Sequence, residues 1–429
     1  MQTRKDIENE FSLPYGKSQL TFEIDPKFYV ESILPNPAQG LENPEYAIRN
    51  ALENPFGDTT LDDFRRAKSV GIAINDKTRP VPHPNPLLSL LDYLDDLGFP
   101  RKSIKLFIGY GTHAPMEIND LRTILPASVI KNYEIITHNC DHSPMVDLGK
   151  TKFNTPIKIN QDYYSCDLKI TVGNIEPHHF MGFSGGVKTA AIGLAGRETI
   201  TANHAMLIDN MAQSGLYHRN PLRQDIEEVG QKIKIDFCLG SILDEDKQIL
   251  KVYFGHPKAV MLEAVPKVRE IFGAKIAAPF DLVIASPGGY PKDINFYQAE
   301  KGLTHAARIT KDGGWVILIA ECSEGSGSTV YEEYASKAES NQAIINDFKN
   351  GFFKIGPHKA YQIAREAERV NIILISDVPP GKVKGWKLTP GNPKELSKII
   401  KHCTSNLLTK ARIGILPAAS RTMTELINE

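Results

Sequence analysis

The sequence predicts an α/β protein of two α/β domains with mainly parallel sheets. Short apolar runs rich in Val, Ile and Leu alternate with segments of helical periodicity along its 429 residues, a pattern typical of strands connected by helical crossovers. The runs contain few polar residues, as in parallel strands that helices cover on both faces. A chain of this length can bury more than one hydrophobic core. The expected strands cover residues 70–75, 104–109, 134–137, 168–172, 282–285, 316–320, 370–376 and 413–416, and the expected helices 87–97, 257–272, 335–349 and 359–370.

Two breaks divide this pattern into domains. The stretch GAKIAAP at 273–279 follows the expected helix 257–272 and precedes a new strand, and a second break falls near 405–410. We therefore expect an N-terminal cofactor-binding domain of residues 1–275, joined by the C-terminal segment 405–429. Residues 276–404 are expected to form a second α/β domain that closes over an active-site cleft, since clefts between hinged domains are common ligand sites.

Composition argues against several classes of partner. Fifty Lys and Arg residues against 51 Asp and Glu leave a net charge of −1 without a dense basic run, which argues against nucleic acid. The five cysteines form no C-x-x-C pair, which argues against a disulfide framework and indicates a reducing cytoplasm. No segment approaches the roughly 20 apolar residues of a membrane span, and the N-terminus lacks an apolar signal region. We expect a cytoplasmic protein with no membrane partner.

Polar side chains follow several expected strands at the point where each strand ends. Because the carboxyl ends of parallel strands meet at one edge of a sheet, and ligands bind there, these side chains predict a site. After three strands of the first domain they are Asp76, Thr78 and Arg79, then His113, then Glu176 and His178; after strand 282–285 of the second domain they are Tyr297, Gln298 and Lys301.

The segment 173–204 combines a glycine loop, a lysine and histidines. The loop GFSGG contains Ser184, Gly185 and Gly186, and it is followed by Lys188 and His204. Glycines let the backbone approach an anion, a lysine can neutralise it or bond to it covalently, and imidazole binds borderline metals. The segment therefore predicts a phosphorylated, metal-bearing cofactor. Its spacing fits neither G-x-x-x-x-G-K-[ST] nor G-x-G-x-x-G, so the loop alone identifies no nucleotide-binding family.

Structural roles compete with these functional ones. Arg79 can pair with Asp76 or bind a carboxylate or phosphate, and His204 lies in a helical run where a buried structural histidine is the alternative. His178 and His179 are adjacent, and neighbours in an extended segment point to opposite faces. We therefore expect only His178 to enter the site.

The motifs DKTRP, GTHAPM, EPHHFMGFSGGVK, the downstream NH, and YQAEK together resemble the nickel-dependent lactate racemase family. The similarity extends from LPYG at 13–16 to GPHK at 356–359. The resemblance implies two α/β domains around a cofactor cleft. It also implies a nickel-pincer nucleotide, a Ni pyridinium-3,5-bisthiocarboxylic acid mononucleotide, which cofactor-biosynthesis proteins must supply.

The resemblance also assigns roles to residues. Lys188 matches the lysine that binds the cofactor covalently, His204 the nickel ligand, and His113 and His178 the two catalytic histidines. The matched cofactor and substrate contacts are Asp76 and Thr78 with the loop residues Ser184, Gly185 and Gly186, and Arg79, Gln298 and Lys301 with the adjacent Tyr297.

These roles predict a racemase or epimerase of a 2-hydroxy acid that uses proton-coupled hydride transfer. One histidine would serve each enantiomer as acid or base, since imidazole titrates near neutrality. Ala114 stands where the family pattern predicts an arginine, so malate, longer aliphatic acids and sugar acids are considered beside lactate. Tyr361 is a candidate aromatic over the substrate. The alternatives are a nucleotide-dependent dehydrogenase or transferase, and a non-catalytic carrier of the nickel cofactor.

Overall fold

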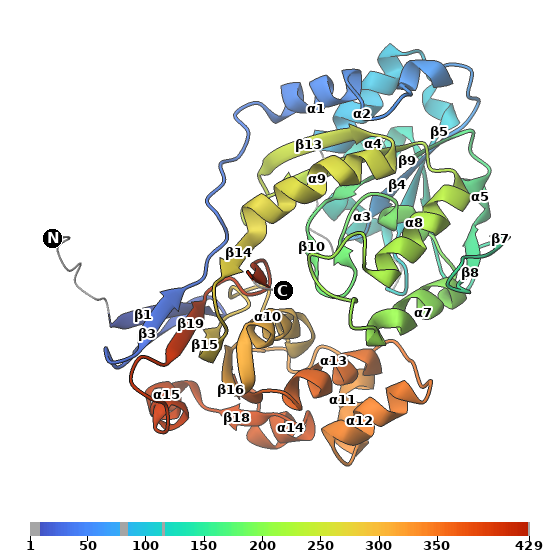
Figure 1. The fold of residues 1–429 in the computed structure, drawn as a ribbon. Coiled ribbons are helices and arrows are strands. Elements are labelled where there is room, and N and C mark those ends of the chain that lie inside the picture. The colour runs from blue at the N-terminus through green and yellow to red at the C-terminus, as the bar shows by residue number, and fades with distance from the viewer. Residues whose placement is uncertain (1–8, 78–84, 114–115, 428–429) are drawn as a thin grey trace. The chain divides into compact units, whose positions relative to one another are not determined.

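The computed structural model of the protein describes residues 9–77, 85–113 and 116–427. The chain divides into two compact units. We call Pro37–Ile271 the middle unit, and Met1–Asn36 together with Phe272–Glu429 the terminal unit. Each unit is built around its own six-stranded sheet (Figure 1).

The sheet of the middle unit has the order β13-β12-β9-β4-β5-β6. All neighbouring strands are parallel except β12 and β13. Val, Ile, Leu and Phe side chains of this sheet pack against α1 (Pro44–Glu53) and α2 (Asn85–Asp96) in one buried cluster. The strands are β4 (Val70–Asn75), β5 (Ile104–Gly109), β6 (Glu134–Thr137), β9 (Leu168–Asn174), β12 (Phe237–Leu243) and β13 (Ile249–Gly255).

The sheet of the terminal unit is wholly parallel, with the order β18-β17-β16-β15-β19-β3. A hairpin of β1 (Glu10–Tyr15) and β2 (Ser18–Glu23) contributes Leu13 and Phe22 to the core of this unit. The sheet strands are β3 (Tyr29–Ser32), β15 (Phe280–Ala285), β16 (Thr310–Ile319), β17 (Asn371–Ile375), β18 (Thr389–Gly391) and β19 (Arg412–Leu416). The main helices are α10 (Phe296–Arg308), α11 (Thr329–Lys337), α12 (Asn341–Lys349) and α13 (Pro357–Ala367).

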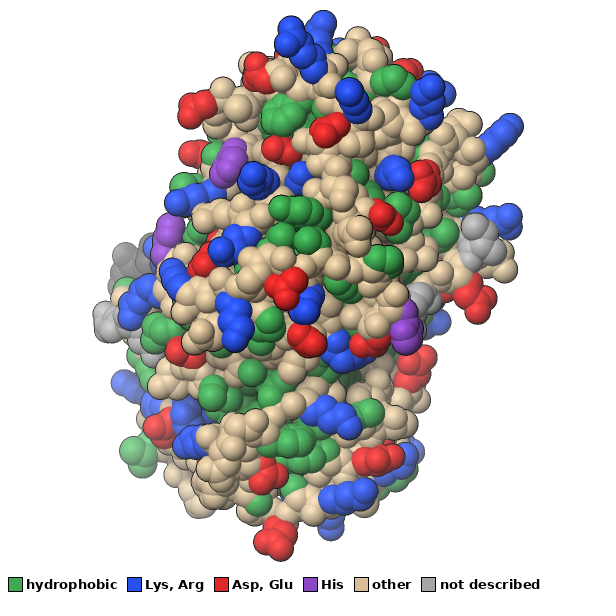
Figure 2. Space-filling view, turned by 90° about the vertical axis from the view of Figure 1, so that its right-hand side faces the viewer, with side chains coloured by type: hydrophobic (Ala, Val, Ile, Leu, Met, Phe, Trp, Pro, Cys, Tyr) green, Lys and Arg blue, Asp and Glu red, His purple; other side chains and the backbone are tan. Residues whose placement is uncertain are grey.

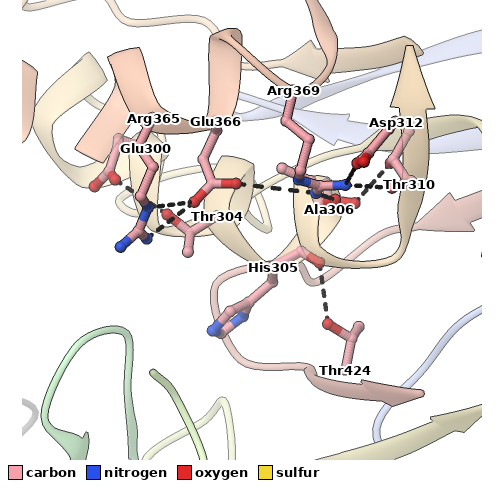
Figure 3. Close-up of polar contacts among 11 residues, drawn as sticks. Glu300, Thr304, His305, Ala306, Thr310, Asp312, Arg365, Glu366, Arg369 and Thr424 are labelled. Atoms are coloured by element: carbon pink, nitrogen blue, oxygen red, sulfur yellow. Dashed lines mark hydrogen bonds and ion pairs between the residues drawn. The ribbon is translucent and has the colours of Figure 1, made fainter. Parts of the chain in front are cut away.

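A polar network fixes the turn between α10 and β16 to the segment after α13 (Figure 3). The Arg369 guanidinium donates to the carbonyl oxygens of Ala307 and Thr310 and to the Asp312 carboxylate. On the other side of α10, the Thr424 hydroxyl donates to the carbonyl oxygen of His305 at 3.0 Å. The bonds to the His305 and Ala307 carbonyls satisfy acceptors in the last turn of the helix, where intrahelical partners are missing.

The predicted α/β pattern is confirmed at most elements. The expected strands 70–75, 104–109 and 134–137 are β4, β5 and β6, and the expected helix 257–272 is α9 (Pro257–Phe272). One predicted helix, 335–349, is wrong, because Ala338 is extended and α12 begins anew after it. The Ser340 side chain accepts a hydrogen bond from the Ala343 N–H at 3.1 Å, which caps this new start.

The two units differ from the predicted domains at both ends of the chain. The N-terminal residues and the C-terminal segment both belong to the terminal unit, because β3 pairs with β19 and β14 (Gly273–Ile276) pairs with β20 (Met423–Leu426). The chain therefore passes between units near residues 36 and 271.

Charged side chains of both signs are intermixed on the face in Figure 2, in keeping with the net charge of −1. In the described part of the chain, no helix is both long enough and apolar enough to cross a membrane. The five cysteines are buried free thiols.

Candidate active site

Asp76 and His113 form a pair at the carboxyl edge of the middle sheet. Asp76 directly follows β4, and His113 lies four residues beyond the neighbouring strand β5. Asp76 Oδ2 lies 2.7 Å from His113 Nδ1, and the side chains are 4% and 45% exposed respectively. A buried carboxylate against a half-exposed imidazole fixes the ring orientation and favours the proton on Nδ1.

His178 lies in a short hairpin that follows β9, the strand on the other side of β4. The hairpin pairs β10 (Pro177–His178) with β11 (Gly182–Phe183). The Met181 N–H donates to His178 Nδ1 at 3.3 Å. Because Nδ1 accepts this bond, the neutral ring carries its proton on Nε2.

The prediction that His179 faces away from His178 is wrong. The two rings stack with centroids 4.8 Å apart and an interplanar angle of 20°. The alternation of an extended strand does not apply, because β10 ends at His178 and His179 begins the turn. Both imidazoles therefore lie on the same side of the hairpin.

Phe180 links these rings to His204. Its ring meets His178 and His179 edge-on at 4.7 Å and 4.5 Å, and meets the His204 ring at 5.2 Å. His204 lies on α7 (Arg197–Ala205), and Phe180 is buried. The two predicted functional histidines of segment 173–204 thus contact one apolar side chain.

The glycine loop crosses the same edge of the sheet. Gly185 and Gly186 have φ of 82° and 62°, values that residues other than glycine rarely adopt. Ser184 between Phe183 and Gly185 is 7% exposed, and its hydroxyl has no hydrogen-bond partner among the described residues. The loop therefore offers a buried hydroxyl with unused hydrogen-bonding capacity.

Lys188 begins α6 (Lys188–Ala191) directly above the strand ends. Thr189 immediately follows Lys188. A Cβ atom on Gly109, the last residue of β5, would lie 2.8 Å from the Thr189 carbonyl oxygen. A Cβ on Gly173 of β9 would lie 3.0 Å from the Thr189 hydroxyl. These close approaches place the start of α6 over β5 and β9, and Lys188 itself is only 8% exposed.

Three of the predicted substrate contacts lie on α10 of the terminal unit. Lys301 Nζ donates to Gln298 Oε1 at 2.8 Å, and the Asn295 side chain caps the helix by accepting from the Gln298 N–H. The Tyr297 ring lies 5.2 Å from Lys359 Nζ, which pairs with Glu300 Oε2 at 2.5 Å. The helix thus presents Tyr297, Gln298 and Lys301 within one turn.

Other predicted residues fall elsewhere. Thr78 and Arg79 lie outside the described residues, as does Ala114. Tyr361 is 3% exposed and stacks on Phe348 with ring centroids 5.1 Å apart, so it belongs to the packing of α12 against α13.

Burial governs the titratable groups around the loop. It raises the pKa of the Cys238 thiol, beneath the loop, to about 11, so this cysteine is neutral at physiological pH. Burial also raises the pKa of Tyr110, between β5 and His113. In the described residues, no group of three or more His, Cys, Asp or Glu side chains is arranged to hold a metal ion by itself.

Sequence reasoning missed Arg223, which lies beneath the glycine loop. Its Nη1 atom donates to the carbonyl oxygens of Phe183 and Gly185 at 3.1 Å each. Arg223 lies in α8 (Pro221–Ile233), forty residues beyond the loop, within an ordinary amphipathic pattern. No local signal in the sequence indicates this contact.

Models of known families match most of the chain. A lactate racemase N-terminal domain matches residues 15–215, and a lactate racemase C-terminal domain matches residues 276–419. A lactate racemase of Thermoanaerobacterium thermosaccharolyticum is 30% identical over 418 residues, which cover 94% of this chain and 96% of that protein. A lactate racemase of Lactiplantibacillus plantarum is 30% identical over 375 residues, covering 85% of this chain and 88% of that protein.

Solved structures agree with these relatives. The lactate racemase apoprotein from Thermoanaerobacterium thermosaccharolyticum superposes with a TM-score of 0.89 at 29% identity, covering 97% of this chain and 100% of that one. A protein from Thermotoga maritima shares the fold with a TM-score of 0.65 at 18% identity, covering 91% of this chain and 100% of that one. The matches therefore extend over both units, and the chain belongs to the lactate racemase family.

Proposed function

We propose that this racemase interconverts the enantiomers, or epimers, of a 2-hydroxy acid with the help of a nickel-pincer nucleotide. Membership of the lactate racemase family makes it an isomerase. The observation that carries the proposal is the pair of differently arranged imidazoles, His113 and His178, at the ends of strands that flank β4. Inverting the configuration at a hydroxyl-bearing carbon requires two acid/base groups, and these two lie at one edge of the sheet.

The residues around the glycine loop fit the proposed cofactor. The unsatisfied Ser184 hydroxyl and the loop at Gly185 and Gly186 suit a phosphate. The buried Lys188 amine would form the covalent attachment, and the His204 imidazole would bind the nickel, for which nitrogen and sulfur are suitable donors. Asp76 and Thr78 are the further proposed contacts. When bound, the nucleotide supplies a hydride acceptor, which avoids a free carbanion at C2.

The two histidines are prepared for opposite proton transfers. Asp76 holds the proton of His113 on Nδ1, so the lone pair of the neutral ring is on Nε2, ready to accept the proton of the substrate hydroxyl. His178 would return a proton to the hydroxyl oxygen as an imidazolium, because the N–H of a neutral imidazole is too weak an acid; in the neutral ring the Met181 N–H donates to Nδ1 and the proton lies on Nε2. In the reverse direction the two rings exchange roles. Each enantiomer therefore meets one base and one acid.

Cationic side chains would bind the substrate carboxylate. Lys301 provides a point charge whose position is restrained by Gln298, and Arg79 would provide a planar fork. Tyr297, on the same helix, would contact the remainder of the substrate. Lactate, malate, longer aliphatic 2-hydroxy acids and sugar acids all carry the required carboxylate and C2 hydroxyl.

The test is a substrate panel on protein produced together with cofactor-biosynthesis proteins. Each acid is followed by loss of optical rotation, and the acid deuterated at C2 is followed by retention of deuterium in the racemised product, with the intact mass measured in parallel. We expect racemisation of at least one acid, and a covalent mass increase that Lys188→Ala abolishes. A loaded protein that racemises none of them would instead be a cofactor carrier. A nucleotide that dissociates and leaves Lys188 unmodified would favour a dehydrogenase or transferase.

A further inference from the structure

Helix α8 (Pro221–Ile233) packs against both α6, which begins at Lys188, and α7, which carries His204. Figure 1 shows α7 and α8. None of the residues of α8 is predicted to take part in the chemistry. We propose that α8 is a platform that positions Lys188 through Arg223 and positions His204 through Asp225. The roles of Lys188 and His204 rest on the proposed function, whereas the contacts that position them do not.

Arg223 binds the backbone on both sides of Ser184. The side chain is fully buried, and its Nη1 atom donates to the carbonyl oxygens of Phe183 and Gly185. Its Nε and Nη2 atoms donate to Glu227 Oε1 at 2.9 Å and 2.6 Å, and the Tyr217 hydroxyl donates to the same oxygen. The charge is thus neutralised from one side while the other side of the guanidinium fixes the loop. A planar fork with several donors can satisfy all these acceptors at once, and an ammonium cannot.

Packing carries this restraint on to Lys188. A Cβ atom on Gly186 would lie 2.8 Å from Arg223 Nη2, so the loop backbone lies directly on the guanidinium. A Cβ atom on Gly230, two turns further along α8, would lie 2.4 Å from Val187 Cγ1. Val187 immediately precedes Lys188. The backbone leading to the lysine is therefore held at both ends by one helix.

The second contact reaches the residue before His204. Asn203 is fully buried on α7, and its Nδ2 atom donates to the Leu222 carbonyl at 3.0 Å and to Asp225 Oδ2 at 2.9 Å. Asp225 Oδ1 accepts from the Thr151 hydroxyl at 2.5 Å. The carboxylate is thus oriented between Thr151 and Asn203, and it fixes α7 against α8 next to His204.

The first test measures the loop without the cofactor. Hydrogen–deuterium exchange of residues 182–190 in the cofactor-free, full-length chain is compared between wild type and Arg223→Lys. We expect exchange to rise by about tenfold, because two buried carbonyls lose their donor. Glu227→Gln is a milder variant, because it removes the charge that pairs with Arg223 but keeps a hydrogen-bond acceptor. It should give a smaller rise in exchange, and it tests the proposal if Arg223→Lys does not fold.

A matched control comes from the terminal unit. Arg369 also binds two main-chain carbonyls and a carboxylate (Figure 3), so Arg369→Lys removes the same chemistry elsewhere. It should leave exchange of residues 182–190 at the wild-type rate. Unchanged exchange in both Arg223→Lys and Glu227→Gln, or an equal rise in Arg369→Lys, would overturn the assignment of Arg223 as a positioning residue.

The second test concerns the cofactor itself. In loaded protein, Arg223→Lys should reduce the fraction of chains with the covalent adduct, while Asn203→Leu should reduce the nickel content per adduct and leave the adduct in place. Intact mass and metal analysis measure the two quantities separately. If Arg223→Lys and Asn203→Leu each lost covalent adduct and nickel content to the same extent, Arg223 and Asp225 would not position Lys188 and His204 separately. A wild-type chain without adduct would refute the proposed function instead, and the exchange experiment would still decide the role of Arg223.

Discussion

At the scale of single residues, the Asp76–His113 pair shows how a buried acid prepares a neighbouring imidazole. The carboxylate is 4% exposed, whereas the imidazole side chain is 45% exposed and reaches toward solvent. The sequence placed both residues at one sheet edge, because parallel strands end together. The 2.7 Å contact between them depends on loop conformations beyond each strand, which the strand pattern does not specify.

We predict that Asp76→Asn lowers kcat/KM by about 10²-fold or more, because an amide no longer favours the proton on Nδ1 of His113. The loss should be equal from both enantiomers, since their equilibrium constant is one and kcat/KM must then change equally in both directions. Polarimetry of each pure enantiomer measures it. Asp95→Asn, which removes a surface carboxylate paired with Arg101, is the control and should retain wild-type rates.

His113→Ala and His178→Ala should each stop racemisation from both enantiomers while the protein retains its nickel. Each variant removes one of the two proton carriers, and the remaining one can complete only half of the exchange. Racemisation and metal content are measured on the same preparation. Loss of nickel in either variant would show that the histidine is a ligand rather than an acid or base.

The buried side chain of His138 should make the stability of the protein depend on pH. It is fully buried, with Nε2 at 3.0 Å from the Ala195 carbonyl and Nδ1 at 3.3 Å from Asn160 Nδ2, and burial lowers its pKa. The folded state therefore keeps this ring neutral, while the unfolded state takes up a proton below about pH 6.5. Stability is then full above that pH and falls as the pH decreases, because the unfolded state binds more protons.

Melting temperatures at about pH 7.5 and about pH 5.5 test this sign. We expect the wild type to lose more stability on acidification than His138→Gln, which cannot titrate. His305, also buried with a lowered pKa, should keep part of the dependence in that variant. A melting temperature that falls equally in the two proteins would contradict the assignment to His138.

At the scale of elements, the β10–β11 hairpin determines the relative orientation of His178 and His179. A tight turn replaces the extended chain that the sequence pattern predicts, so His178 and His179 stack instead of diverging. The turn depends on Gly182, which has φ of 77° and whose Cβ position lies 1.9 Å from the Leu216 carbonyl oxygen. A distant segment of the chain thus occupies the space that any other side chain would need.

Gly182→Ala should therefore cost about 2–4 kcal/mol of unfolding free energy, from left-handed strain together with a backbone clash. Gly149→Ala is the matched control, since Gly149 has φ of 80° but its Cβ position meets nothing within 4 Å. It should lose only about 1–2 kcal/mol from strain alone. Chemical denaturation gives both values, and equal losses would show that the approach of Leu216 has no energetic consequence.

At the scale of the whole molecule, the terminal unit is assembled from both ends of the chain. The β1–β2 hairpin places Leu13, Tyr15 and Phe22 in the same buried cluster as residues of strands β15, β16, β17 and β19. The Tyr15 hydroxyl also donates to Asp377 at 2.7 Å, and the Gly16 N–H donates to Asp293 at 2.7 Å. Removing these residues would expose the core they cover.

We predict that residues 272–429 alone do not fold, whereas residues 1–36 joined to them through a flexible linker do. The sequence-based domain 276–404 should fail as well, because it lacks β3 and β19 at one edge of its sheet. Cooperative thermal unfolding and protection from proteolysis measure the outcome. A well-folded fragment of residues 276–404 would favour the sequence-based division.

The sequence by itself determined the α/β class and most strand positions, because buried parallel strands are continuous apolar runs that local pattern reveals. It also determined the family, since the motif order from the LPYG segment to YQAEK is recognisable without coordinates. The tertiary structure alone decided that the chain ends join one unit, that His179 stacks on His178, and that Arg223 supports the loop before Lys188. These three features depend on contacts between residues distant in sequence or on the shape of one turn. The periodicity of a local segment encodes neither such contacts nor the shape of a turn.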